Sequence, residues 1–409
     1  MREYGQGAWE GVEALREAVD EIGAARVIPY VQKAIASTVR VILRADDSNG
    51  TIGDLIRSLL EMHAHLCAAE PPPTAKLVPW LVKFQFDGTQ DFFDIDIVDY
   101  AESLGERGMA RYRSELARIT EALSPEPSED EERALREAQY RDHEPYERMV
   151  NDRHARFLLD YNTKRLAVVD RDIDAIVAVY GGDQSRAYRL HDVAKALVEI
   201  GEVDRAIGFA ERAALSERSF QAEKAAHYWC ELLALHRPAE EFAARNSVFE
   251  HWPSSSNASG LRDAAAGEWE WEWEWEWAGI QERVLTVLAA RPYDYIVFLL
   301  LTLSDVPRAW AEALRLDLDS DDLWIRLVDA YQQLDLAAVV SVLCRLIESD
   351  LRVADVGNYR SAVKRLRQLR TISAGVGQTD DARAYTAQLR EQHRNRPRFL
   401  QELDRAKFL

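Results

Sequence analysis

Residues 188–214 read YRLHDVAKALVEIGEVDRAIGFAERAA, and the spacing of their apolar side chains sets the fold class of the whole chain. In the first half, apolar residues recur at three- and four-residue steps, which places them on one face of a helix. Gly201 interrupts this pattern, and a second stripe of small apolar residues begins at Val203. The stretch therefore predicts two short helices that fold back on each other around one glycine.

A helical hairpin of this kind cannot bury its apolar face alone, so it needs neighbouring hairpins. Similar periodicity continues on both sides of residues 188–214 and is interrupted only by short turns. We therefore expect an all-α protein, a tetratricopeptide-like α-solenoid of antiparallel helical hairpins. Such arrays hold partners more often than they catalyse reactions, which favours a non-enzymatic scaffold for protein–protein interaction.

Breaks in the periodicity predict four regions: an N-terminal helical domain, a helical-repeat region, a loop with a Glu-Trp repeat, and a C-terminal helical-repeat region with a basic end. Their bounds are 1–124, 125–252, 253–279 and 280–409. The acidic, proline-containing stretch SPEPSEDEE at 124–132 is typical of a linker, and Ser128 with Glu131 predicts a capping box at its end. Thr51 and Asp54 resemble such a box at the start of an earlier helix.

Five consecutive Glu-Trp pairs occupy residues 268–277. If this segment is extended, every tryptophan lies on one face of the strand. One interpretation is a solvent-facing low-complexity insertion. The other is an exposed aromatic ribbon that pairs with a partner or self-associates. The tryptophans of this candidate partner surface are Trp269, Trp271, Trp273, Trp275 and Trp277.

Composition excludes several classes of protein. The apolar stretches are too short to span a bilayer, and the first residues show no secretory signal. Cys67, Cys230 and Cys344 are widely spaced, which argues against a disulfide framework and predicts reduced, buried thiols in the cytoplasm. We expect no membrane association.

The net charge of −19 is unevenly distributed along the chain. Residues 359–409 hold 12 Lys and Arg against 5 Asp and Glu, so the rest of the chain is strongly acidic. The basic end is interpreted either as an intramolecular or solvated face, or as a contact for phosphate groups of a nucleic acid. The arginines of this candidate contact are Arg365, Arg367, Arg370, Arg394, Arg396 and Arg398.

Candidate catalytic and metal-binding residues are few. The chain lacks the common nucleotide-binding, hydrolase and metalloprotease motifs. His63 and Cys67 are four residues apart and share a helical face, whereas His65 points elsewhere. With no second pair nearby, these residues are better explained as packed helix residues than as metal ligands. We therefore predict no metal and no cofactor.

An acidic run at residues 91–99 alternates with apolar residues. Carboxylates brought together in this way can serve in general acid–base catalysis, but no His, Lys or Arg within the run is available as a partner. A loop with a buried aromatic face is the favoured interpretation, and an enzyme remains a minor alternative. The acids are Asp91, Asp94, Asp96 and Asp99.

Several segments taken together resemble the region that follows the zinc finger in bacterial SWIM zinc finger proteins. They are DDSNG at 46–50, LLEMHAHLC at 59–67, PWLVKF at 79–84, DYAESLGERGMARYR at 99–113 and YTAQLREQHRNRPRFLQELDRAKF at 385–408. The resemblance implies a tetratricopeptide-like scaffold that works with a finger contacting nucleic acid or protein. Because the widely spaced cysteines cannot form the C-x-C and C-x-H pairs of a finger, it implies no zinc site here.

These observations predict a non-enzymatic scaffold whose partner is another protein. The alternative is a nucleic-acid-associated accessory protein that uses the basic C-terminal region. Neither the identity of the partner nor the oligomeric state follows from the sequence.

Overall fold

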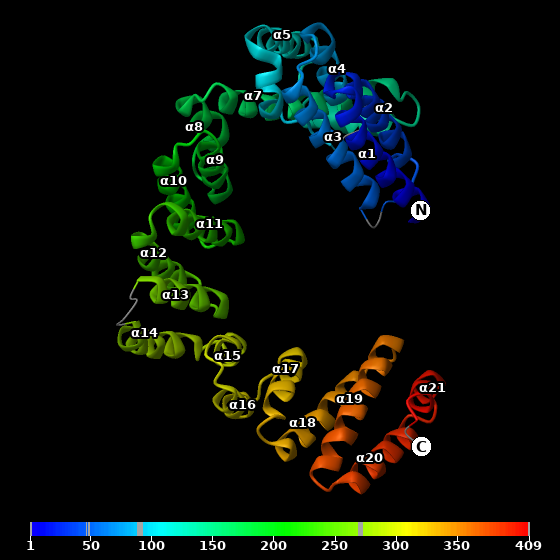
Figure 1. The fold of residues 1–409 in the computed structure, drawn as a ribbon, viewed down its shortest axis with the longest axis vertical. Helices are drawn as coiled ribbons and strands as arrows, with labels where there is room; N and C mark the ends of the chain where they lie inside the picture. Colours follow the sequence, from blue (N-terminus) through cyan, green and yellow to red (C-terminus); the bar gives the residue numbers. More distant parts are fainter. Residues whose placement is uncertain (1, 46, 48–49, 88–92, 269–272, 408–409) are drawn as a thin grey trace. The chain divides into compact units, whose positions relative to one another are not determined.

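The computed structural model describes residues 2–45, 47, 50–87, 93–268 and 273–407. Within these residues the chain forms 21 α-helices and no strand, so the expected all-α class is confirmed (Figure 1). The chain divides into two compact units, residues 1–225 and 226–409. This division falls inside helix α11 (Phe220–His236).

The first unit begins with a bundle of long helices and continues with shorter ones. Its main core joins side chains of α2, α3 and the turn η1, among them Ile35, Ile56 and Tyr100. The elements are α1 (Arg2–Ile22), α2 (Ala24–Ile42), α3 (Thr51–Ala69), α4 (Thr74–Phe86), the 3₁₀ turn η1 (Ile97–Tyr100), α5 (Ala101–Ala122), α6 (Glu129–Ala138), α7 (Glu144–Val169), α8 (Ile173–Gly181), α9 (Ala187–Glu199) and α10 (Val203–Ser216).

The start of α3 differs from its expected form. Gly50 has a φ of 71°, which turns the chain so that the carboxylate of Asp47 accepts hydrogen bonds from the amides of Ile52 and Gly53, each at 2.9 Å. Asp54 instead pairs with Arg57 at 2.7 Å. The expected capping box of Thr51 and Asp54 is therefore wrong. The Asp47 carboxylate, from the preceding turn, accepts the hydrogen bonds of the first helical amides instead.

The expected capping box at α6 is confirmed. The Ser128 hydroxyl accepts from the amide of Glu131, and the Glu131 carboxylate accepts from the amide of Ser128 at 2.8 Å. This arrangement satisfies two donors at the helix start. It fixes the end of the proline-containing segment before α6.

The predicted hairpin at residues 188–214 is present as α9 and α10, which pack against each other. Gly201 lies between them with a φ of 82°. Ala206, Ala210 and Ala213 are fully buried, and their small side chains let the two helices approach closely. The position of the glycine and the small residues both follow the sequence pattern.

Replacing Gly201 by alanine is expected to lower the free energy of unfolding by about 1–2 kcal/mol, because an L-residue is strained at this φ. A methyl group there would meet only Arg171 at 3.9 Å, so the cost comes from the backbone and not from a clash. Gly208, in the middle of α10, has open space around it and is the matched control.

Gly208→Ala is expected to stabilise the helix by roughly 0.5–1 kcal/mol. Urea unfolding of both variants and the wild type measures the difference. If the two substitutions change stability in the same direction, the strain assigned to the hairpin turn is contradicted.

In the second unit, most helices pack on their neighbours in the sequence, as α12 does on α13 and α18 on α19. Trp310 stacks on Tyr331 at 4.5 Å between ring centroids and meets the edge of Trp324 at 5.4 Å. The elements are α12 (Pro238–His251), α13 (Ser255–Glu268), α14 (Trp273–Leu288), α15 (Pro292–Val297), the π turn η2 (Phe298–Thr302), α16 (Val306–Arg315), α17 (Asp321–Tyr331), α18 (Leu336–Asp350), α19 (Val356–Gly375), α20 (Thr379–Gln392) and α21 (Pro397–Arg405).

Residues 255–268 were expected to be a loop, but they form α13. Ala258, Leu261 and Ala265 are fully buried at helical spacing, so a narrow face of small residues packs this helix into the core. Asn257 donates its side-chain amide to the carbonyl of Trp252 at 2.7 Å, and its backbone amide donates to the Ser254 hydroxyl at 3.1 Å. The Ser-rich composition thus marks the start of a helix and not a loop.

No helix in the described part of the chain combines the length and apolarity needed to cross a membrane.

Candidate binding pocket

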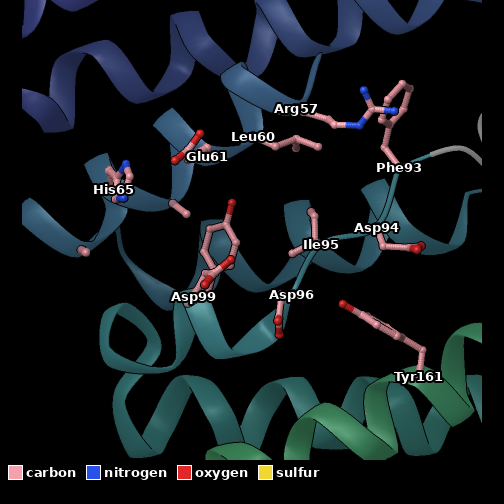
Figure 2. Close-up of a pocket in the computed structure, with 13 residues that line it drawn as sticks. Arg57, Leu60, Glu61, His65, Phe93, Asp94, Ile95, Asp96, Asp99 and Tyr161 are labelled. Atoms are coloured by element: carbon pink, nitrogen blue, oxygen red, sulfur yellow. The ribbon is translucent and has the colours of Figure 1, made fainter. Parts of the chain in front are cut away.

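A pocket of about 500 Å³ lies in the first unit between α3, the segment before η1, and α7 (Figure 2). Phe93, Ile95 and Ile97 are buried, whereas Asp94 and Asp99 in the same alternating segment are exposed. This is the buried apolar face expected for the acidic run. The lining residues are Arg57, Leu60, Glu61, Ala64, His65, Ala68, Phe93, Asp94, Ile95, Asp96, Asp99, Tyr100 and Tyr161.

Local hydrogen bonds hold the acidic segment in this position. The side-chain amide of Gln85 donates to the carbonyl of Ile95 at 2.9 Å. The Asp96 carboxylate accepts from the amide of Val98 at 3.0 Å and so caps η1. The pocket wall is therefore an ordered turn with defined side-chain directions.

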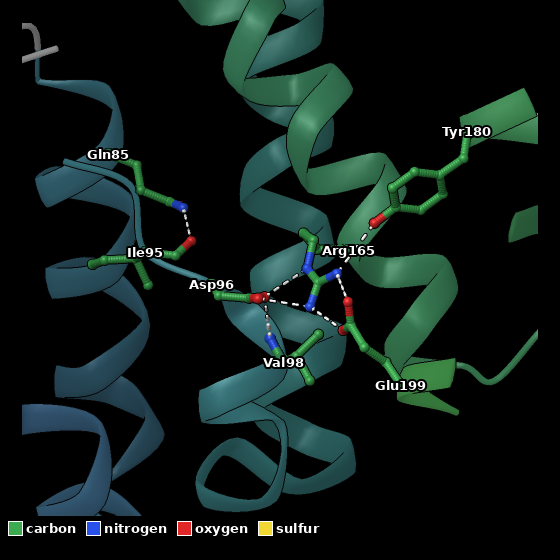
Figure 3. Close-up of polar contacts among 7 residues, drawn as sticks. All are labelled: Gln85, Ile95, Asp96, Val98, Arg165, Tyr180 and Glu199. Carbon is green, nitrogen blue, oxygen red and sulfur yellow. Dashed lines mark hydrogen bonds and ion pairs between the residues drawn. The ribbon is translucent and has the colours of Figure 1, made fainter. Parts of the chain in front are cut away.

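Arg165 fixes the carboxylate of Asp96 at one side of the pocket (Figure 3). Its Nε lies 2.9 Å from Asp96 Oδ1, and its Nη2 lies 2.6 Å from both Asp96 Oδ2 and Glu199 Oε2. Its Nη1 also donates to the Tyr180 hydroxyl at 3.2 Å. One side chain thus joins the acidic segment to α7, α8 and α9.

The electrostatics of this cluster favour the ionised pair. Burial opposes the charged form of Arg165, but hydrogen bonds to Glu199 and Asp96 outweigh it and raise the pKa of the guanidinium. The Arg165 side chain is only 12% exposed. Asp96 is therefore held as an ion-pair partner, which removes it as a free general base.

The remaining charges leave the pocket negative. Arg57 belongs to the lining and pairs with Asp54, which does not. With Asp96 neutralised by Arg165, the other lining carboxylates are Glu61, Asp94 and Asp99, and they outnumber Arg57 and His65, the basic residues of the lining. The Asp99 amide donates to the Asp96 carbonyl at 3.2 Å, but neither the Asp94 nor the Asp99 side-chain carboxylate makes a hydrogen bond or ion pair with another described residue. The pocket is therefore suited to a positively charged group.

The pKa values of the Asp94 and Asp99 carboxyls are raised. For Asp94, partial burial raises the pKa, and nearby His154 acts in the opposite direction. For Asp99, partial burial raises the pKa and the neighbouring Asp96 carboxylate adds to it, whereas Arg165 and His65 oppose it. A cation entering the pocket would stabilise both ionised forms.

An adjacent pocket of about 700 Å³ shares Asp96 and Tyr161 with the first. Its charges are largely paired, since Lys164 contacts Asp160 at 2.6 Å and Arg189 contacts Asp183 at 2.8 Å. This second pocket lacks the excess of free carboxylates that marks the first. The first is therefore the stronger candidate site.

His63 and Cys67 are packed core residues, as the sequence favoured. His63 is fully buried, with Nδ1 2.9 Å from the Tyr100 hydroxyl and Nε2 2.9 Å from the side-chain nitrogen of Gln32. Burial raises the pKa of the Cys67 thiol to about 12. His65 lies apart from them on the pocket wall. Within the described residues, no group of three or more His, Cys, Asp or Glu is placed to hold a metal ion.

The arginines of the basic end differ in their contacts and exposure. Arg365 forms an ion pair with Asp350 and is largely buried. Arg394 pairs with Glu391 at 2.5 Å, and Arg396 donates to the carbonyl of Leu351. Arg370 donates a long hydrogen bond, of 3.5 Å, to the carbonyl of Lys407. Arg367 and Arg398 are exposed. Nucleic-acid contact through this end stays a prediction.

The Glu-Trp repeat becomes helical at its C-terminal end. Trp277 is 4% exposed and donates its indole N–H to Gln281 at 2.9 Å, so it stabilises the core and is not an exposed partner surface. Trp273 and Trp275 lie in α14, where helical geometry does not keep alternate residues on one face. Trp269 and Trp271 lie outside the described residues, as does Asp91 of the acidic run.

Sequence reasoning missed Glu61, Tyr161 and Arg165. Arg165 lies 69 residues from its partner Asp96, and Tyr161 reaches the pocket from α7. Within the sequence, each is one polar or aromatic residue in a helical pattern. No local signal connects them to the acidic run.

Residues 12–263 match the model of a family described as "Family of unknown function (DUF6880)". No curated protein matches the chain. The resemblance to SWIM zinc finger proteins is wrong, because no SWIM family matches and four of the five segments that suggested it lie inside the DUF6880 match. Those segments are mostly amphipathic helices rich in Leu, Ala and Arg, a pattern that unrelated helical proteins share.

Proposed function

We propose that this chain, which belongs to the DUF6880 family of unknown function, is a non-enzymatic helical-repeat scaffold that binds another protein through the first-unit pocket. The observation that carries the proposal is the excess of carboxylates over basic side chains in the lining of a pocket of about 500 Å³. Asp94 and Asp99 are exposed there, and neither carboxylate forms an ion pair with another described residue. Such a site attracts a cationic group of a partner.

The scaffold part of the proposal is a tetratricopeptide-like solenoid of antiparallel hairpins. It is supported by α9 and α10, which pack around the turn at Gly201, and by the pairing of α18 with α19. Arrays of this kind bury a continuous core by stacking sequence neighbours. The cytoplasm is the proposed location, since Cys67, Cys230 and Cys344 are unpaired thiols.

The proposed lack of catalysis is supported by how the polar groups of the pocket are used. Asp96 is held by Arg165, and the Tyr100 hydroxyl is bonded to His63. Among the described residues, no Ser, Thr, Cys or Lys lines the pocket as a nucleophile. The remaining carboxylates are better placed to hold a cation than to start acyl or phosphoryl transfer.

A pair of neighbouring alanines provides the test. Ala68 lines the pocket, and Ala69 does not, although both are exposed at the end of α3. Ala68→Arg would fill the pocket and neutralise its charge. We expect proteins recovered by affinity purification with the wild type to be retained by Ala69→Arg and to fall about tenfold with Ala68→Arg, which corresponds to 1.4 kcal/mol of binding.

Circular dichroism of both variants controls for folding. Equal recovery by all three proteins contradicts the proposed site. Recovery of no protein above the background contradicts the scaffold function itself.

A further inference from the structure

One face of α7 carries a row of two exposed apolar side chains and two partly exposed rings, here called the apolar stripe, which leads into the pocket. Val150, His154, Phe157 and Tyr161 are spaced at steps of four, three and four residues, which keeps them on one narrow helical face. Val150 is 41% and Phe157 is 61% exposed. Tyr161 at the end of the stripe lines the pocket beside Asp94 (Figure 2).

His154 connects the stripe with the pocket charge, because its electrostatic effect reaches the Asp94 carboxylate. The stripe therefore ends at a group of free carboxylates, with an aromatic ring between the two. Exposed apolar residues in a continuous row are typical of a docking surface for an amphipathic segment.

We propose that this surface holds a basic amphipathic segment of the partner protein. Its apolar side chains would pack on Val150 and Phe157, and one Lys or Arg would enter the pocket between Asp94 and Asp99. The inference rests on the proposed function and names the chemistry of the partner.

Charge complementarity decides the class of partner. The free carboxylates repel the phosphates of a nucleic acid and the headgroups of an anionic membrane. A small free cation would leave the apolar stripe uncovered. A protein segment with both a basic and several apolar side chains matches the pocket carboxylates as well as the apolar stripe. A bound guanidinium would also gain attraction from the ring of Tyr161.

The test is selection from a random peptide library against the purified full-length chain. We expect enriched peptides to contain Lys or Arg close to large apolar residues. Their enrichment should fall about tenfold or more with the Asp94→Asn/Asp99→Asn double variant and with Phe157→Ser, because each removes one half of the surface.

Two exposed positions that belong neither to the stripe nor to the pocket lining serve as controls. Tyr140 is 91% exposed and follows α6, and Asp130 in α6 has a side chain that is 91% exposed. Tyr140→Ser and Asp130→Asn match the apolar and the charge change, and we expect both to leave enrichment unchanged. All of these positions except Asp94 and Asp99 lie outside the pocket lining.

The outcomes separate this inference from the proposed function. Enriched peptides that depend on the pocket but lack basic residues overturn the inference and leave the function standing. Both are overturned if peptides are enriched equally with the wild type and all the variants, or if no peptide is enriched. If the chain instead forms a dimer that Phe157→Ser dissociates, the occupant is a second copy and the inference is wrong.

Discussion

Replacing Arg165 by alanine is expected to lower the free energy of unfolding by about 3 kcal/mol, because it leaves Asp96 and Glu199 beside each other without their shared counter-charge. The Arg165 side chain is 12% exposed, and its Nη2 contacts both carboxylates at 2.6 Å. Because the Glu199 side chain is 41% exposed, the loss is smaller than for a fully buried pair. Chemical unfolding measures the loss.

Two further variants show whether the bidentate geometry matters. Arg165→Lys keeps the charge but cannot reach both carboxylates with paired donors, so we expect an intermediate loss. Arg16, which pairs with Glu13 at 2.6 Å on an exposed part of α1, is the control. Arg16→Ala should cost less than about 1 kcal/mol. A similar loss for Arg165→Ala and Arg16→Ala would show that the cluster does not hold the first unit together.

Lowering the pH from 7 to 4 is expected to cost the wild type about 3 kcal/mol more stability than it costs the His63→Gln variant. Burial lowers the pKa of His63 to about 4 from an ordinary value of 6.5. The unfolded state therefore binds more protons than the folded state between these values. Stability from neutral His63 is fully present above pH 6.5 and is lost as the pH falls toward 4.

The comparison with His63→Gln isolates this residue, because carboxyl groups titrate in both proteins. His191, whose pKa is also lowered to about 4, first by burial and then by Lys195 and Lys224, is common to both as well. Denaturant unfolding across this pH range gives the two stability curves. Parallel curves would show that His63 is protonated without cost and is not held neutral by its surroundings.

Features set by neighbouring residues could be predicted from the sequence. The hairpin around Gly201 follows from apolar spacing and one glycine, and the capping box of Ser128 and Glu131 follows from residue types three positions apart. The buried side of the acidic run follows from its alternation. Each of these depends on contacts within a few residues.

Features that depend on distant residues could not be predicted. The carboxylate of Asp96 looked free because its partner Arg165 lies on another helix. Residues 255–268 looked like a loop because the apolar face of α13 is narrow and made mostly of alanine. Trp277 was predicted to be exposed in an extended repeat, but it lies on a helix and its side chain is buried in the core.

The most direct test of the binding surface is the dissociation constant of one enriched basic peptide, measured by fluorescence anisotropy with the wild type, Ala68→Arg and Ala69→Arg. The account predicts equal affinity for the wild type and Ala69→Arg, a dissociation constant about tenfold higher for Ala68→Arg, and weaker binding at high salt. Equal affinity for all three proteins would contradict a peptide site at the pocket formed by α3, the acidic segment and α7.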